Sequence, residues 1–144
     1  MFLVHRLNAP RVLPGFLART FATAPIKDSP AEISDSRFES EAGRALERIF
    51  EAIETATDAD SSLNEGVLHI EFPDGTFIIN KHTLTKQLWY SSPVIGPAYF
   101  EALTVSGRRW FSLKLDRDVY DQLALDVKKL ANIKILYPQE TDGK

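Results

Sequence analysis

The sequence predicts an α+β fold, a two-layer sandwich in which an antiparallel sheet of five to six strands carries an N-terminal and a C-terminal helix on one face. Two segments, residues 38–56 and 120–131, repeat apolar side chains at the helical spacing of three and four. Between these segments, apolar and polar side chains alternate in short runs, which is the pattern of half-buried strands. Turn-forming Pro and Gly residues separate the runs, so we expect neighbouring strands to pair antiparallel.

Composition limits the chain to one small domain and excludes several kinds of site. Its 144 residues, 44% hydrophobic and 26% charged, suit a single domain with a small core. The absence of cysteine excludes disulfides, thiolate nucleophiles and cysteine-ligated zinc or iron–sulfur sites, so a metal would need oxygen or imidazole ligands. No apolar run approaches the ~20 residues that cross a bilayer, and we expect no membrane partner.

Residues 1–21 are expected to be a mitochondrial transit peptide, which places the protein in the mitochondrial matrix. They contain three arginines among apolar residues, and no acidic residue precedes Asp28. An ordinary N-terminal tail is the alternative. Without these arginines the formal net charge falls from −3 to −6, which disfavours nucleic acid and favours cations or basic partners. Residues 22–34, with two prolines and small side chains, are expected to be a flexible linker.

The first helix is predicted to be capped by Asp35 or Ser36 and to end near Thr57. Outside its apolar stripe, carboxylates recur at spacings of four, three and four residues, which places them along one outer ridge. This acidic ridge consists of Glu47, Glu51, Glu54 and Asp58, and Asp60 continues its charge toward the strands. A solvated helix surface without a ligand is the alternative explanation, because most surface helices carry such charges.

Five strands are predicted between the helices. They cover residues 67–72, 76–81, 86–91, 98–105 and 108–115. The second helix is predicted to be capped by Asp116 or Asp118 and to stop at Asn132. Residues 138–144 are expected to be a loose tail.

One face of the third predicted strand combines an aromatic ring with polar groups. Gln87 and Trp89 stand there at a two-residue spacing, and Asn80 and Lys81 are expected close by, in the preceding turn. A Trp has an apolar body and one N–H donor, which is the combination that anchors protein interfaces. A buried core Trp is the alternative.

The central stretch also contains a longer motif. It consists of Ile79-Asn80-Lys81, Lys86-Gln87-Leu88-Trp89-Tyr90-Ser91-Ser92-Pro93 and Gly96-Pro97. In residue types and spacing this run resembles the signature of the frataxin family, the small mitochondrial iron-binding proteins of iron–sulfur cluster assembly. The resemblance extends weakly from the segment near Phe38 to the segment near Ala131.

The resemblance implies a frataxin-like domain over residues 35–137, whose last segment packs along both helices. It implies that carboxylates of the first helix and the adjoining strand bind iron, as Fe2+ or Fe3+. Glu51, Asp58 and Asp60 match acidic positions of the family. An open ridge of oxygen ligands leaves water on the metal, so we expect weak binding at several sites.

The resemblance also implies docking on the iron–sulfur scaffold protein and the cysteine desulfurase complex through the outer sheet face. The partner-binding residues carried over from the family are Asn80, Lys81, Gln87 and Trp89. The chain departs from the family at His82, where relatives often have Gln. It departs again at Tyr99, where relatives usually carry a basic residue that aids docking.

Three functions are compatible with these residues. The leading hypothesis is an iron-binding protein that promotes mitochondrial iron–sulfur cluster assembly. A ferroxidase that oxidises Fe2+ to Fe3+ for storage or detoxification is one alternative, and an iron-independent structural adaptor is the other. The sequence has no glycine-rich phosphate loop and no catalytic triad order, so a conventional active site is not expected. We expect a monomer, with iron-dependent oligomers as the alternative.

Overall fold

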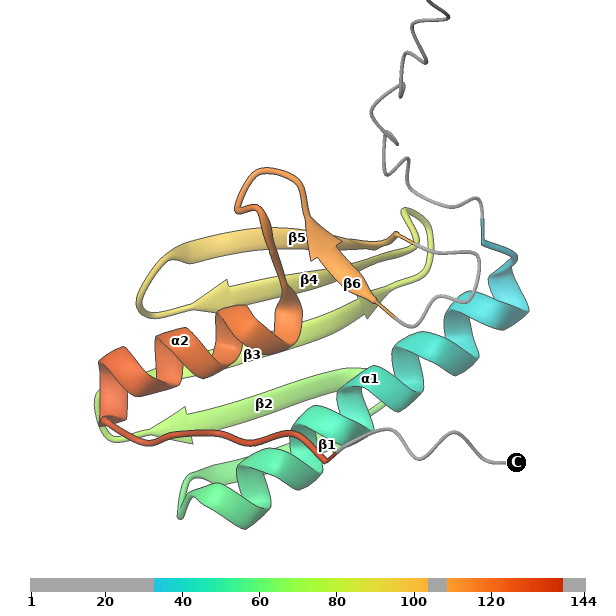
Figure 1. The fold of residues 1–144 in the computed structure, drawn as a ribbon. Helices are drawn as coiled ribbons and strands as arrows, with labels where there is room; N and C mark the ends of the chain where they lie inside the picture. Colours follow the sequence, from blue (N-terminus) through green and yellow to red (C-terminus); the bar gives the residue numbers. More distant parts are fainter. Residues whose placement is uncertain (1–32, 104–108, 139–144) are drawn as a thin grey trace, which may run out of the picture.

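The protein folds as a two-layer sandwich in which two helices cover one face of an antiparallel sheet (Figure 1). The computed structural model describes residues 33–103 and 109–138. The elements are α1 (Asp35–Ala56), β1 (Asp60–Asn64), β2 (Val67–Phe72), β3 (Gly75–His82), β4 (Gln87–Ser92), β5 (Gly96–Ala102), β6 (Trp110–Ser112), β7 (Arg117–Asp118) and α2 (Val119–Ala131). Within the described ranges the strands pair in chain order, from β1 at one edge to β7 at the other. The predicted fold class is confirmed.

The sheet of the described residues has seven strands, and the predicted number of five to six is wrong. Periodicity does not detect β1, because its five residues contain a single apolar side chain, Leu63. The last predicted strand is shortened to Trp110–Ser112, and β7 adds two residues after a turn. β5 ends at Ala102. Its predicted continuation through residues 104–105 lies outside the described residues, as do residues 1–32 and 139–144 with their predicted roles.

The N-cap of the first helix lies one residue before the nearer of the two predicted caps, Asp35. This N-cap is Ser34, whose hydroxyl accepts a hydrogen bond from the Arg37 N–H at 3.4 Å, and the helix ends at Thr57 as predicted. The apolar stripe of this helix is buried from Phe38 to Ile53. Ile33 is only 4% exposed, so it belongs to the folded core and not to the linker.

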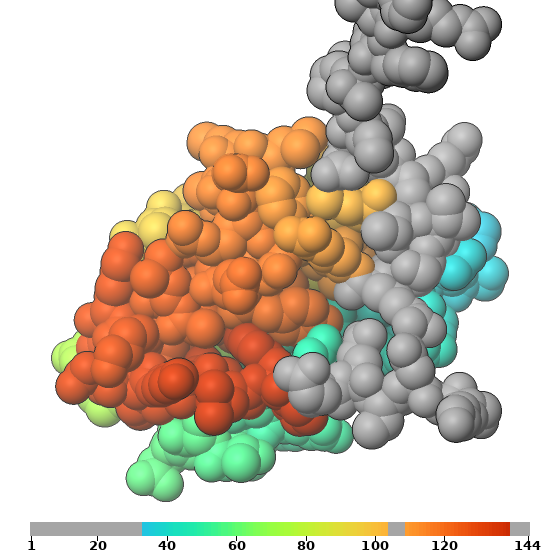
Figure 2. All heavy atoms as spheres, viewed as in Figure 1, coloured from blue at the N-terminus to red at the C-terminus, as the bar shows by residue number. Residues whose placement is uncertain are grey.

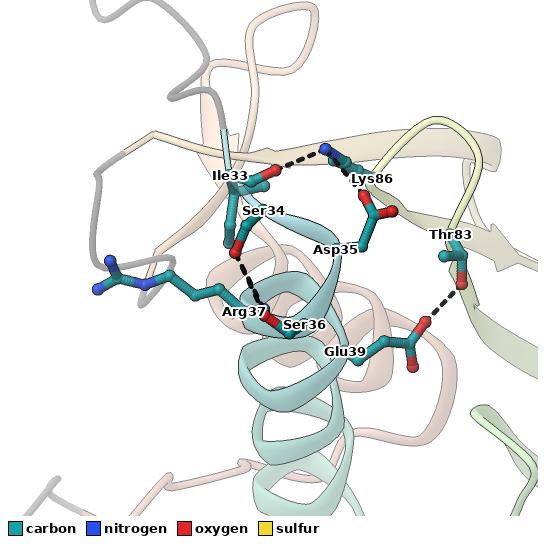
Figure 3. Close-up of polar contacts among 8 residues, drawn as sticks. All are labelled: Ile33, Ser34, Asp35, Ser36, Arg37, Glu39, Thr83 and Lys86. Carbon is teal, nitrogen blue, oxygen red and sulfur yellow. Dashed lines mark hydrogen bonds and ion pairs between the residues drawn. The ribbon is translucent and has the colours of Figure 1, made fainter.

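Side chains from the turn between β3 and β4 bind the start of α1 (Figure 3). The Lys86 ammonium donates to the Ile33 carbonyl at 2.6 Å and pairs with Asp35 at 3.1 Å. The Thr83 hydroxyl donates to the Glu39 carboxylate at 2.6 Å. These contacts join the helix layer to the sheet at the start of α1.

The core lies between the helices and the sheet. Leu68 and Ile70 of β2 are buried while their neighbours are more exposed, as the alternation predicts. Trp110 is fully buried and meets Phe38 edge to face, with ring centroids 5.7 Å apart. In the space-filling view from the same side, α2 and the segment that follows it, drawn in red-orange, lie over the sheet (Figure 2). None of the helices described is both long and apolar enough to cross a membrane.

A buried carboxylate connects α2 to the end of β4. Asp126 has no exposed surface. It accepts hydrogen bonds from the Tyr90 hydroxyl (2.7 Å), the Ser92 hydroxyl (2.8 Å) and the Gln122 amide (2.9 Å). Burial, followed by the hydrogen bond to Asp126, raises the pKa of Tyr90 above its ordinary value, so the phenol stays a donor. Ser92 also accepts from the Val94 N–H at 3.0 Å, which orders the following turn.

The segment after α2 packs against both helices, as the resemblance implies. Ile135 is buried, and the Tyr137 hydroxyl donates to the Tyr120 carbonyl of α2 at 3.0 Å. From α1, Arg48 donates to the Pro138 carbonyl at 2.8 Å and lies over the Tyr120 ring, 4.7 Å from its centroid. These contacts hold the segment after α2 against both α2 and α1.

Candidate functional site

Outward side chains of three neighbouring strands meet on the sheet face away from the helices. They form two rows across β3, β4 and β5, Asn80–Trp89–Tyr99 and His82–Gln87–Glu101. We call these six residues the outer-face grid. Side chains directly opposed in an antiparallel pair have Cβ atoms about 5 Å apart, so neighbours within each row are in reach of each other.

Trp89 stands at the centre of this grid and is held by aromatic contacts on two sides. Its indole is 37% exposed, which excludes the alternative of a core Trp. The His82 ring stacks on it with centroids 3.8 Å apart and planes 10° apart. Tyr99 meets it edge to face at 5.5 Å. His82 is itself held by a hydrogen bond between Nδ1 and the Thr85 hydroxyl, 2.8 Å long.

Hydrogen bonds run through the grid toward a carboxylate. The Trp89 Nε1–H donates to the Gln87 carbonyl oxygen at 3.2 Å, and the Gln87 amide nitrogen donates to Glu101 Oε1 at 2.7 Å. Each group in this chain polarises the next, which strengthens such networks. The grid is therefore an ordered surface in the free protein, and the predicted placement of Gln87 and Trp89 on one face is confirmed.

Lys81 does not belong to this surface, and its predicted placement beside Asn80 is wrong. Both residues lie in β3 and not in a turn, so strand alternation turns them to opposite faces. The Lys81 ammonium reaches α1 and pairs with the Glu39 carboxylate. Hydrogen bonds from Lys81 and, second, from Thr83 lower the pKa of Glu39. Asn80, Gln87 and Trp89 are brought together, and Lys81 is separated from them.

Two residues of the grid were not predicted as site residues. Glu101 was not considered, and Tyr99 was noted only because relatives carry a basic residue there. The short connection between the strand of Trp89 and the next strand could have placed both residues beside Trp89 and Gln87. Because β4 pairs with β5 from Ser92 opposite Gly96, counting back along both strands sets Tyr99 opposite Trp89. That count requires the strand ends to be known, and these ends depend on the turn that Ser92 orders.

Two surface hollows border the grid. The smaller, about 230 Å³, lies along Ile78, Trp89 and Pro97. The larger, about 450 Å³, is lined by residues of β4, β5 and the segment after β6, among them Gln87, Tyr99, Glu101, Phe111, Leu113 and Lys114. Tyr99 is 52% exposed and Leu113 64% exposed. The surface beside the grid thus offers apolar contact area with a few charged groups.

The acidic ridge is exposed along its whole length. Its members Glu47, Glu51, Glu54 and Asp58 all have exposed side chains. Among residues 33–103 and 109–138, no three His, Asp or Glu side chains are close enough to hold one metal ion together. The ridge therefore offers separate carboxylates in water, and its role in iron binding stays a prediction.

Asp60 does not continue the ridge. The Ser61 hydroxyl donates to the Glu54 carboxylate, so Ser61 faces α1. Strand alternation then turns Asp60 to the other sheet face, where it lies opposite Glu71 of β2. Asp60 and the helix carboxylates cannot share one ligand set in this arrangement.

The frataxin-like domain family matches residues 31–133, which includes both the outer-face grid and the acidic ridge. The chain belongs to the frataxin family. A curated relative, the mitochondrial frataxin-like protein of Leishmania donovani, is 36% identical over 106 residues, which cover 69% of this chain and 56% of the relative. The chain spans about half the length of the curated relatives it matches.

Solved structures of this family have the same fold. A frataxin from Psychromonas ingrahamii superposes with a TM-score of 0.62 at 22% identity, covering 71% of this chain and 95% of that chain. Yeast frataxin superposes with a TM-score of 0.56 at 31% identity, covering 67% and 82%. Four curated relatives are named as mitochondrial proteins, and the predicted mitochondrial localisation is confirmed.

Proposed function

We propose that this frataxin promotes mitochondrial iron–sulfur cluster assembly. It docks on the scaffold protein and the cysteine desulfurase complex through the outer-face grid, and it binds iron weakly on the acidic ridge. The observation that carries this proposal is the partly exposed Trp89, held in place by His82, Gln87 and Tyr99 before any partner binds.

A pre-ordered indole favours protein docking over other uses of this surface. Interfaces concentrate their binding energy in a few central residues, and Trp is enriched among them. A side chain already held in one geometry loses little conformational freedom on binding, so more of its contact energy contributes to affinity. The hollows along Trp89 and Tyr99 provide space on either side for partner side chains.

The separation of the two surfaces allows both activities at once. The ridge lies on α1, in the helix layer that covers one face of the sheet (Figure 1). Alternation along β3, β4 and β5 turns the side chains of the grid to the other face. A partner bound to the grid leaves the ridge carboxylates in water. Iron is a hard cation that accepts such oxygen ligands and keeps water in its remaining positions. In this proposal iron is cargo that the protein holds near the assembly complex.

The test is Trp89→Ala in the full chain, assayed with the scaffold and desulfurase complex. Loss of a hot-spot indole should cost about 2 kcal/mol or more of binding free energy and slow cluster assembly at sub-saturating concentrations. The matched control is Leu136→Ala, which shortens an exposed apolar side chain in the segment after α2, on the helix side of the sheet. An unchanged assembly rate and affinity in the Trp89→Ala protein would reject the docking proposal.

A further inference from the structure

Glu101 ends the hydrogen-bonded row of the grid with a negative charge. Its Oε1 accepts the Gln87 amide, which in turn accepts the Trp89 N–H. No described residue is hydrogen-bonded to its second oxygen, Oε2, and none forms an ion pair with the Glu101 carboxylate. The row therefore leaves one charged acceptor at the edge of the ordered surface.

Covering this surface with a partner would remove water from that carboxylate. Glu101 is half-buried already, and it lies diagonally from Trp89 in the grid. A carboxylate taken out of water without a positive partner is strongly unfavourable, whereas a charge-assisted hydrogen bond offsets the loss. A protein that packs over Trp89 must therefore supply a cation near Glu101.

The neighbouring hollow has the shape and chemistry for a long cationic side chain. Its walls near Glu101 include the Tyr99 and Phe111 side chains, and its volume is about 450 Å³. A guanidinium is planar, stacks on aromatic rings and donates several hydrogen bonds in one plane, so it can contact a ring and a carboxylate together. An ammonium group satisfies the charge but not the stacking.

Two cations of the chain itself lie in this region and neither pairs with Glu101. Lys114 lines the same hollow with an exposed side chain. The Arg109 guanidinium lies over the Phe111 ring, 5.1 Å from its centroid. The described structure thus leaves the Glu101 charge for an external group.

We propose that Glu101 determines partner specificity by receiving an arginine of the docked protein, whose guanidinium occupies the hollow between Tyr99 and Phe111. This inference rests on the proposed docking through the outer-face grid. At position 99, where relatives usually carry a basic residue, this chain has Tyr99, and its neighbour in the grid, Glu101, is negatively charged. The complementary surface of the partner is therefore cationic at this point.

The experiment measures the affinity of full-chain variants for the purified scaffold and desulfurase complex by calorimetry at two salt concentrations. Glu101→Gln keeps the size of the side chain and an acceptor for Gln87 but removes the charge. Its Kd should rise about 10-fold at low salt, and the salt dependence of Kd should weaken. The matched control, Glu71→Gln, removes a charge from the same face outside the grid and should leave Kd unchanged.

Other outcomes overturn the inference in distinguishable ways. If Trp89→Ala weakens binding and Glu101→Gln does not, the docking proposal holds and the arginine contact is rejected. If Lys114→Gln raises Kd as much as Glu101→Gln, Lys114 is the counterion and the partner cation is rejected. If Trp89→Ala itself leaves Kd unchanged, docking through the grid fails and the inference fails with it.

Discussion

Side-chain spacing predicted the acidic ridge and the Gln87–Trp89 pair at the centre of the outer-face grid, yet only the grid gathers its side chains into a connected surface. The grid gathers side chains from three strands into two opposed rows, where rings stack and hydrogen bonds connect neighbours. The ridge places carboxylates along one helix, and no three acidic or imidazole groups converge within the described residues. A sheet brings distant residues to one point, whereas one helix spaces its own residues along a line.

The largest expected effect comes from removing the support beneath the grid. Asp126→Ala leaves the buried donors of Tyr90, Ser92 and Gln122 without their acceptor, which should lower the free energy of unfolding by about 3 kcal/mol or more. Urea unfolding measures this loss. The control Asp121→Ala, on the exposed side of the same helix, should change stability by about 0.5 kcal/mol. Equal losses in the two variants would contradict a structural role for the buried network.

A smaller effect is expected when the grid loses one ring. His82→Ala removes the stacking partner of Trp89 and should weaken partner binding by about 1 kcal/mol, roughly fivefold in Kd. Titration calorimetry with the assembly complex measures the change. His69→Ala, which removes an outward imidazole on β2 away from the grid, should leave Kd unchanged. If both histidine variants bind like the unmodified protein, the stack does not pre-order Trp89 for binding.

Lys81 follows Asn80 in the sequence but lies on the helix side of the sheet, outside the grid. Lys81→Met keeps the apolar stem but removes the partner of Glu39, so partner affinity should not change. The stability loss should be about 0.5 kcal/mol or less, because the Glu39 side chain is 42% exposed and water screens the pair.

The pH dependence of this pair has a definite sign. The pKa of Glu39 is lowered in the folded state, so the contribution of the ion pair to stability is fully present above the ordinary glutamate pKa of 4.5. It disappears as pH falls through the lower folded-state pKa. The free energies of unfolding of the unmodified protein and the Lys81→Met variant, measured from about pH 6 downward, should therefore differ above about pH 4.5 and converge below it. A lower affinity of the Lys81→Met variant for the assembly complex would show that Lys81 takes part in docking.

The smallest single effects are expected on the ridge. Changing Glu47, Glu51, Glu54 or Asp58 singly to its amide should alter iron affinity by less than about twofold, since independent sites contribute separately. The fourfold variant should lose most iron-induced NMR broadening along α1. One amide that abolishes binding alone would instead reveal a shared centre.

The same fourfold variant separates ferroxidase chemistry from simple binding. Carboxylates stabilise Fe3+ more than Fe2+, so in air-saturated buffer dissolved O2 should oxidise ridge-bound Fe2+ faster than free Fe2+. Stopped-flow oxidation at equal rates in the unmodified and fourfold-amide proteins would assign the oxidation to free iron.

Local patterns predicted most elements because their signals lie in neighbouring residues. The alternation of Leu68 and Ile70 with polar neighbours predicted β2, and the cap at Asp118 and the stop at Asn132 bound α2 as expected. β1 was missed because pairing with β2, not its own apolar content, makes it a strand. Ile33 was assigned to the linker because one apolar residue among polar neighbours has no periodicity.

The site was predicted in part for the same reason. Gln87 and Trp89 share a face through two-residue spacing within one strand. Tyr99 and Glu101 join them only through strand pairing, and Asp126 is buried only because Tyr90 and Ser92 face it across the sheet and helix layers. An acidic residue near lysines on a helix looks solvated until such partners are known.

The amino-acid sequence by itself determined the fold class, the family and the two faces of β2 and β4, since these depend on periodicity and on a contiguous motif. Tertiary structure alone decided that Trp89 is tied to Glu101, that Lys81 turns to the helices and that Asp60 leaves the acidic ridge. The physical reason is that a side chain's partners across strands and layers depend on register and packing, which no local spacing contains.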